Sequence, residues 1–127
     1  MERLSESQED YLEEIYVQVL KNGHAKVTEI SASLNVRKAS VTSALNLLAS
    51  RGLISYAPYS PITLTEEGRN KAEKILKKHK LLKELFEEIL RLDNAQEIAC
   101  SVEHLISDKN FDKINSFVNS YKGEKNV

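Results

Sequence analysis

The stretch ASVTSALNLLASRGLISYAPYSPITL, residues 39–64, decides the fold that this sequence predicts. Its first half carries apolar residues at helical spacing and ends before a glycine, which indicates a helix over about residues 39–50. Residues 53–56 and 62–64 read as two strands around a turn with two prolines. A short helix over residues 28–34 is expected before this stretch, after a tight connection. Two short helices followed directly by a hairpin predict a winged helix-turn-helix with a small two-stranded β wing.

The second of these helices has an outward face that suits the major groove of DNA. Its inward face, with Val41, Leu45 and Leu48, should pack on the domain, whereas the opposite face is small, polar and free of acids. Residues 25–62 carry four basic side chains and one acidic one, a modest basic patch in a chain of net charge −1. The residues predicted to contact DNA are Arg37, Lys38, Ala39, Ser40, Thr42, Ser43, Tyr59 and Ser60. The alternative is an ordinary helical hairpin.

Composition limits the class of protein. The chain has 127 residues, of which 41% are hydrophobic and 29% charged, so it should fold as one compact domain or two small ones that share a core. Its single cysteine excludes an internal disulfide and fits a reducing compartment. No apolar run is long enough to cross a bilayer, and residues 1–6 do not resemble a signal peptide. We therefore expect a cytoplasmic protein without a membrane partner.

Four more helices make the expected fold mainly α. The first begins with a capping box of Ser5 and Gln8, ends at Asn22-Gly23, and has a buried stripe that includes Val19 and Leu20. The other helices are expected from Thr65 to about Arg91, over about residues 95–106, and from Asp108 to about Tyr121, with a loose tail over residues 122–127.

A thiol, a carboxylate and an imidazole lie within five residues, at Cys100, Glu103 and His104. On an α-helix they fall within an arc of roughly 100°, opposite an apolar face that includes Leu105. His79 lies in the apolar stripe of the long helix, and helices joined by a tight link pack as antiparallel neighbours. These chemistries together indicate a metal site. The alternatives are an exposed polar face with a small cysteine, and a hydrogen-bonded core histidine.

Two acids on the first helix extend the list of candidates. Asp10 and Glu13 stand one turn apart, away from the centre of the buried stripe. Acidic side chains in such a place are most often only solvated. They matter to a metal site only where a cation lies opposite them.

The chain resembles the diphtheria toxin repressor and manganese transport regulator family. The resemblance covers nearly the whole chain and is carried by residues 5–16, 40–42, 63–69, 78–82 and 100–108. It implies a metal-dependent transcriptional repressor, not an enzyme, that binds a palindromic double-stranded DNA operator as a homodimer and controls metal uptake genes. The implied domains are a DNA-binding domain over residues 1–65 and a helical metal-binding and dimerisation domain over residues 66–127. The implied metal ligands are Asp10, Glu13, His79, Cys100, Glu103 and His104.

The implied ligand set mixes two branches of that family. The iron-sensing branch has a methionine in place of Asp10, and the manganese branch has a glutamate in place of Cys100. Mn²⁺ prefers oxygen donors and a thiolate suits Fe²⁺, Co²⁺ or Zn²⁺ better, so the mixed donor set leaves the identity of the metal open. The resemblance implies Mn²⁺ or Fe²⁺, with Zn²⁺ or Co²⁺ possible in vitro. Lys83 and Gln96 replace a glutamate and a histidine of the iron branch's ancillary site. We hypothesise that the Lys83 ammonium partly replaces a second cation.

Two other functions stay open on the sequence alone. One is a winged-helix regulator with a non-metal effector, in which His79 and Cys100 are core residues. The other is a small metallohydrolase, since carboxylates and histidines around a metal can activate water. The sequence offers no further base or oxyanion donor, so the hydrolase ranks last.

Overall fold

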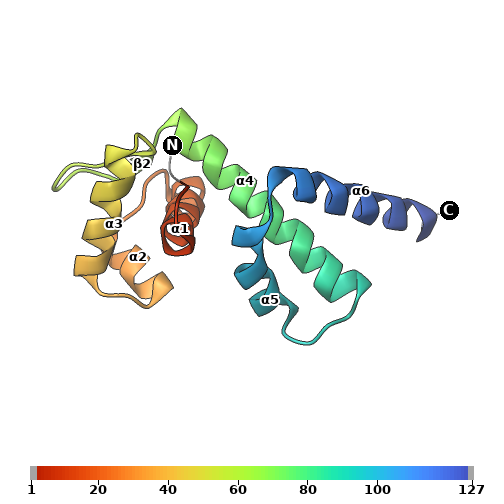
Figure 1. Cartoon of the computed structure of the whole chain (residues 1–127). Helices are drawn as coiled ribbons and strands as arrows, with labels where there is room; N and C mark the ends of the chain where they lie inside the picture. Colours follow the sequence, from red (N-terminus) through yellow and green to blue (C-terminus); the bar gives the residue numbers. More distant parts are fainter. Residues whose placement is uncertain (1–2, 126–127) are drawn as a thin grey trace. The chain divides into compact units, whose positions relative to one another are not determined.

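The computed structural model describes residues 3–125, and Figure 1 shows the course of the chain. The elements in order are α1 (Glu6–Asn22), α2 (Val27–Leu34), α3 (Lys38–Ser50), β1 (Ile54–Ser55), β2 (Thr63–Leu64), α4 (Glu66–Lys83), η1 (Glu84–Ile89), α5 (Ala95–Val102), η2 (Glu103–Leu105) and α6 (Asp108–Lys125). The predicted class, mainly α with a two-stranded wing, is confirmed. Residues 1–2 of the segment compared with a signal peptide, and residues 126–127 of the expected tail, lie outside the described residues.

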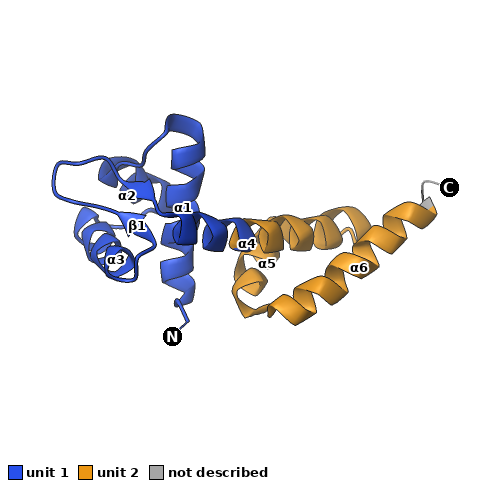
Figure 2. Ribbon diagram, turned by 90° about the horizontal axis from the view of Figure 1, so that it is seen from above, with its two compact units in different colours: residues 1–74 blue, residues 75–127 orange. Residues whose placement is uncertain are grey.

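The chain divides into two compact units, residues 1–74 and 75–127, which Figure 2 colours separately. The division falls inside α4, whereas the sequence predicted a functional boundary at the start of this helix. Each unit has its own buried apolar side chains, such as Leu12 and Ile15 in the first and Leu82 and Val118 in the second.

Helix α1 begins and ends as predicted. The Ser5 side chain accepts a hydrogen bond from the Gln8 amide at 3.1 Å, and the Gln8 side chain accepts one from the Ser5 amide at 2.9 Å. Gly23 ends the helix with a φ of 84°. The predicted stripe is wrong at its end, because Leu20 is 58% exposed and Gln18 is buried instead.

The burial of Gln18 has a local cause. Its Nε2 donates to the Glu14 carboxylate at 3.0 Å, and its Oε1 accepts from the Lys26 amide at 3.2 Å, at the start of α2. A buried amide with both its donor and its acceptor used is stable inside a protein. The side chain therefore joins α1 to the next helix, and apolar Leu20 is left on the outside.

Helices α2 and α3 form the predicted helix-turn-helix. Asn35 ends α2 in a left-handed conformation, with a φ of 54°, and the Ser31 hydroxyl donates to the Val36 carbonyl to close the turn. The buried side chains of the pair are Ile30, Val41, Leu45 and Leu48. Helix α3 begins at Lys38, one residue earlier than expected.

The hairpin forms where predicted, but its strands are shorter. β1 pairs antiparallel with β2 in the register Ile54 to Leu64 and Ser55 to Thr63. Ile62 pairs instead with Ala25, whose amide donates to the Ile62 carbonyl at 2.9 Å. The wing is therefore also attached to the segment that leads into α2.

The start of α4 lies close to the backbone of the hairpin. The Thr65 hydroxyl caps the helix by accepting from the Gly68 amide at 3.0 Å, and the Thr65 amide donates to the Leu53 carbonyl at 3.1 Å. A Cβ at Gly68 would lie 1.8 Å from that carbonyl oxygen. Only glycine allows this approach.

The second unit departs further from the regular helices that were expected. Helix α4 continues through wide π-helical turns to Ile89, where the Leu90 amide donates to the Leu85 carbonyl five residues back. Helix α5 ends at Val102 and is followed by the tighter 3₁₀ turn η2, so the single helix expected over residues 95–106 is wrong. Helix α6 runs to Lys125, so residues 122–125 are helical and not loose.

Several large apolar side chains of the second unit lie on its surface. The exposed ones are Leu90, Leu92, Leu105, Phe117 and Tyr121. The rings of Phe117 and Tyr121 stack on α6 with their centroids 6.5 Å apart. In the part of the chain that the structure describes, no helix combines the length and apolarity that a membrane span requires.

We predict that Gly68→Ala lowers the free energy of unfolding by about 1–3 kcal/mol or more, because the new methyl group would overlap the Leu53 carbonyl. Thermal unfolding followed by circular dichroism measures the change. Gly123→Ala is the matched control, since a Cβ there meets nothing within 4 Å and alanine favours a helix. Equal melting temperatures for Gly68→Ala and the parent protein would contradict the prediction.

Candidate metal centre

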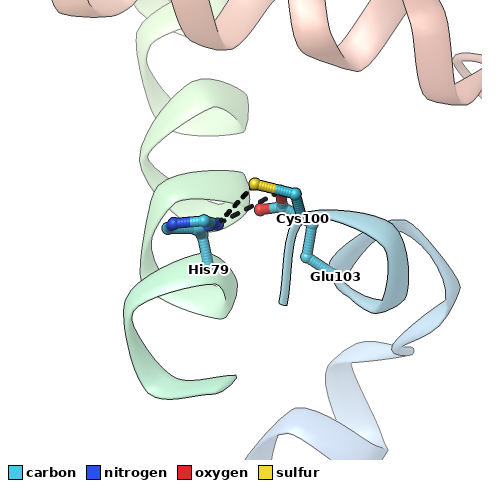
Figure 3. Close-up of side chains that lie close together, drawn as sticks. All are labelled: His79, Cys100 and Glu103. Carbon is cyan, nitrogen blue, oxygen red and sulfur yellow. Dashed lines mark hydrogen bonds and ion pairs between the residues drawn. The ribbon is translucent and has the colours of Figure 1, made fainter. Parts of the chain in front are cut away.

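Three donor side chains come together in the second unit. Figure 3 shows His79 of α4 facing Cys100 of α5 and Glu103 of η2. The His79 Nδ1 lies 3.3 Å from the Glu103 Oε1 and 3.7 Å from the Cys100 Sγ. One nitrogen, one sulfur and one oxygen atom of these residues all lie within 4.8 Å of one another.

These separations suit one ion. Metal bonds to nitrogen, oxygen and sulfur of about 2.0–2.3 Å place tetrahedral ligands about 3.3–3.8 Å apart. The two distances to His79 Nδ1, 3.3 Å and 3.7 Å, fall in that range. The donor set, an imidazole, a thiol and a carboxylate, is also one that binds divalent transition metals. The residues present therefore fit a metal ion.

The 3₁₀ turn η2 sets the direction of Glu103 and His104. Both residues are buried, at 3% and 7% exposed, and Leu105 is 79% exposed. The helical arc placed Leu105 with the core and the two polar residues opposite it, so that part of the prediction is wrong. The reason is that α5 ends at Val102, and a 3₁₀ turn advances each residue by about 120° and not 100°.

The remaining predicted ligands lie at different places. His104 Nε2 is 3.9 Å from Glu103 Oε1, within the same turn η2. Asp10 and Glu13 are half-buried on α1, in the first unit. The structure thus brings His79, Cys100 and Glu103 together, and the part that Asp10, Glu13 and His104 play stays a prediction.

Gln96 contacts the cluster, which the sequence did not predict. Its side-chain nitrogen lies 3.0 Å from His79 Nε2 and 3.8 Å from Cys100 Sγ. The sequence showed Gln96 only as a replacement at an ancillary position. The available signal was its spacing, since residues four apart on a helix lie on the same face, as Gln96 and Cys100 do on α5.

Lys78 of α4 binds the segment that follows η2, at Ile106 and Asp108. Its Nζ donates to the Ile106 carbonyl at 2.7 Å and lies 3.3 Å from the Asp108 carboxylate. These contacts hold the end of η2 against α4. The lysine next to His79 therefore helps to fix the position of Glu103 and His104.

The environment of His79 favours its neutral form. Burial lowers the pKa of His79 from its usual value of 6.5, and the charges of Lys83 and His104 lower the pKa further. A neutral imidazole has a lone pair for a metal, whereas a protonated one has none. Near neutral pH, His79 is therefore available as a ligand.

The predicted DNA contacts lie on the surface of the first unit. Arg37 precedes α3, and its neighbours Lys38, Ala39 and Ser40 are exposed, as is Ser43 one turn later. Tyr59 is fully exposed at the tip of the hairpin, next to exposed Ser60, and has a φ of 63°. Thr42 is half-buried, and its hydroxyl donates to the Lys38 carbonyl at 3.1 Å. These positions can meet a groove and its flanking phosphates, and their contacts with DNA stay predictions.

Two family models account for almost the whole chain. The N-terminal DNA-binding domain of iron-dependent repressors matches residues 3–62, and the metal-binding and dimerisation domain of iron-dependent repressors matches residues 65–124. The chain belongs to the iron-dependent repressor family. This is the family of the diphtheria toxin repressor and the manganese transport regulator, as the sequence predicted. The chain is thus a metal-dependent transcriptional repressor with a DNA-binding and a dimerisation domain, in a family of regulators and not of enzymes.

Individual relatives agree with this assignment. The chain is 41% identical over 122 residues to an uncharacterised HTH-type transcriptional regulator of Methanocaldococcus jannaschii, covering 94% of this chain and 98% of the relative. It is 32% identical over 119 residues to the HTH-type transcriptional regulator MntR of Oceanobacillus iheyensis, covering 93% and 81%. The crystal structure of IdeR from T. acidophilum matches with a TM-score of 0.77 at 27% identity, covering 94% of this chain. This chain spans only 56% of the length of that solved protein.

We predict that His79 titrates below pH 6.5 in the metal-free repressor, and that Lys83→Met moves its pKa upward, because removal of the nearby ammonium favours imidazole protonation. Histidine resonances followed by NMR against pH measure both values. Since the folded protein binds this proton less tightly than the unfolded chain, stability from this group is present above pH 6.5 and is lost as the pH falls through the folded pKa. Lys77→Met, at an exposed position of the same helix, is the control and should leave the titration unchanged. A midpoint at or above 6.5 would contradict the prediction.

Proposed function

We propose that this repressor binds a palindromic operator as a homodimer when a divalent ion is held by His79, Cys100 and Glu103, and that it controls metal uptake genes from within the cytoplasm. The observation that carries the proposal is the convergence of three different donor atoms within 4.8 Å. Family membership supplies the link from such a site to DNA binding.

Donor chemistry bears on which ion is sensed. The Cys100 thiol favours Fe²⁺ over Mn²⁺, because Mn²⁺ prefers ligand sets made of oxygen atoms and imidazoles. Carboxylates at Asp10, Glu13 and Glu103 would compensate by adding oxygen donors. We propose Fe²⁺ or Mn²⁺ as the cofactor, with Zn²⁺ and Co²⁺ binding in vitro.

The full ligand set is part of the proposal. His104 adjoins Glu103 in the buried turn η2, which supports a role beside it. Asp10 and Glu13 lie one turn apart on α1, so both can face the same ion. Because α1 packs against α2 and α3, ligands on α1 would transmit metal binding to the helix-turn-helix.

The protein's own groups determine how strongly the ion acts. A bound ion supplies positive charge beside the buried Glu103 carboxylate. The His79 imidazole and the Cys100 thiol must present their lone pairs to it, so protons compete with the ion and its affinity falls as the pH falls. The ion promotes repression only to the extent that it binds the DNA-competent arrangement more tightly than the alternatives.

As in other helix-turn-helix proteins, some residues would contact the DNA backbone and others the base edges. Arg37 and Lys38 would contact phosphates at the start of α3, and the wing tip at Tyr59 would contact the backbone. The small exposed residues Ala39, Ser40 and Ser43 allow the helix to approach base edges and thymine methyl groups. In a dimer, two such helices would fit successive major grooves.

The test of the function is DNA binding with and without metal. Duplexes selected from a random pool in the presence of Mn²⁺ are labelled and titrated with protein by fluorescence anisotropy, in Mn²⁺, anaerobic Fe²⁺, Zn²⁺ or EDTA. We expect at least about tenfold tighter binding with a divalent ion, which corresponds to about 1.4 kcal/mol of coupling.

Variants of the proposed ligands test whether these residues produce the metal-dependent DNA binding. Cys100→Ser and Asp10→Asn should bind the duplex weakly in metal, and Ser101→Ala, at the exposed neighbour of Cys100, should behave as the parent protein. Equal affinity for the duplex after exhaustive chelation would refute metal-dependent binding. A normal response in Asp10→Asn would remove this residue from the ligand set.

The charge of Lys83 tests how many ions bind. Lys83 is half-exposed, lies 3.9 Å from the Glu87 carboxylate, and lowers the pKa of His79. We expect Lys83→Glu to bind more metal per subunit than the parent protein, since it replaces a cation by a ligand beside the site. Equilibrium dialysis with elemental analysis gives the count. Lys77→Glu makes the same change of charge at an exposed position of α4, and an unchanged count in Lys83→Glu would discard the hypothesis.

A further inference from the structure

We propose that Gln96 is a positioning residue that controls the tautomer of His79, and thereby whether Nδ1, the ring nitrogen that faces Cys100 and Glu103, carries a proton or a lone pair. This inference depends on the proposed metal binding for its consequence, but its first readout is made on the metal-free protein. The observation behind it is that Gln96 is the hydrogen-bond partner of His79 Nε2, whereas Glu103 and Cys100 lie near His79 Nδ1.

The contacts of Gln96 define one arrangement of protons. With the amide nitrogen 3.0 Å from His79 Nε2, the amide donates and Nε2 accepts, so the neutral ring carries its proton on Nδ1. That proton then points to the Glu103 carboxylate, 3.3 Å away. The second hydrogen of the amide group points toward Cys100 Sγ at 3.8 Å. In this arrangement, every donor of the three contacts meets an acceptor.

Metal binding at Nδ1 requires the other tautomer. The lone pair of Nδ1 must face the ion, so the ring proton has to leave Nδ1 while Nε2 gains one, with no net change in the charge of the ring. Nε2 is then a donor and needs an acceptor. Rotation of the Gln96 amide by about 180° about its last side-chain bond presents its oxygen in place of its nitrogen, at the same distance.

An amide can therefore donate to Nε2 in one tautomer of His79 and accept from Nε2–H in the other. No other side chain of this length does both. A carboxylate at position 96 accepts only, and a thioether offers no strong hydrogen bond of either kind. Partners of this sort typically contribute 10- to 100-fold to metal affinity by fixing the ring. Gln96 would thus hold His79 in place before the ion arrives and stabilise the metal-binding tautomer afterwards.

The first arm of the test measures the tautomer of His79 in the metal-free protein, from nitrogen-15 chemical shifts and two-bond couplings in the ring. We expect the Nδ1–H form to predominate in the parent protein. Gln96→Glu, which keeps the acceptor and removes the donor, should shift His79 to the Nε2–H form. Gln96→Met should give a mixture. The control is Glu97→Met, at the exposed neighbouring position of α5, which should not change the tautomer.

The second arm measures Zn²⁺ affinity by competition with a chromophoric chelator. The same NMR experiment then gives the tautomer of His79 in the zinc-bound protein. We expect Gln96→Met to bind Zn²⁺ about tenfold more weakly than the parent protein, with melting temperatures within the range of Glu97→Met. The proposal is overturned if Gln96→Met and Gln96→Glu keep the parent tautomer, or if Zn²⁺ affinity is unchanged in Gln96→Met. Failure of the proposed function would differ, because the parent protein itself would then bind DNA equally with and without metal.

Discussion

The buried carboxylate of Glu103 is the constraint on which the second unit depends. Burying an ionised group costs several kcal/mol unless donors or cations surround it. The fold places His79 Nδ1 3.3 Å and His104 Nε2 3.9 Å from this carboxylate, and it can do so only because α5 gives way to the turn η2. A His79 ring with a lowered pKa is neutral near pH 7 and compensates the carboxylate only by hydrogen bonding. A divalent ion would add positive charge beside this carboxylate, so this one buried residue would link the local fold to metal binding.

Features that depend on short-range signals were predictable from the sequence. The capping box of Ser5 and Gln8 needs only two residues three apart, and both of its hydrogen bonds form. The helix-turn-helix and the wing were recognised because glycine, proline and apolar spacing mark their limits. The convergence of His79 with Cys100 and Glu103 was also expected, since the link between α4 and α5 is short and α5 packs against η1.

Features that depend on helix winding were not predictable. A helical wheel drawn at 100° per residue assigned Leu105 to the core and His104 to the surface. Because the chain changes to a 3₁₀ turn, Leu105 is exposed and His104 is buried instead. The change from an α-helix to a 3₁₀ turn depends on contacts within the whole unit, such as the hydrogen bond from Lys78 to the Ile106 carbonyl. No local sequence signal encodes this change. The contact of Gln96 with His79 was missed for a different reason, because it joins two helices and concerns an uncharged side chain.

Lys83 and Gln96 act on the same imidazole. Lys83 acts through charge, which lowers the pKa of His79, and Gln96 acts through a hydrogen bond to its Nε2. The charge of Lys83 is weakened by solvent, since its side chain is 47% exposed and pairs with Glu87, so it favours the neutral ring without strongly repelling an ion. Under our proposal, the amide of Gln96 would then set the tautomer of that neutral ring. Both residues would thus act on His79 before any ion binds, Lys83 by keeping the ring neutral and Gln96 by holding its orientation.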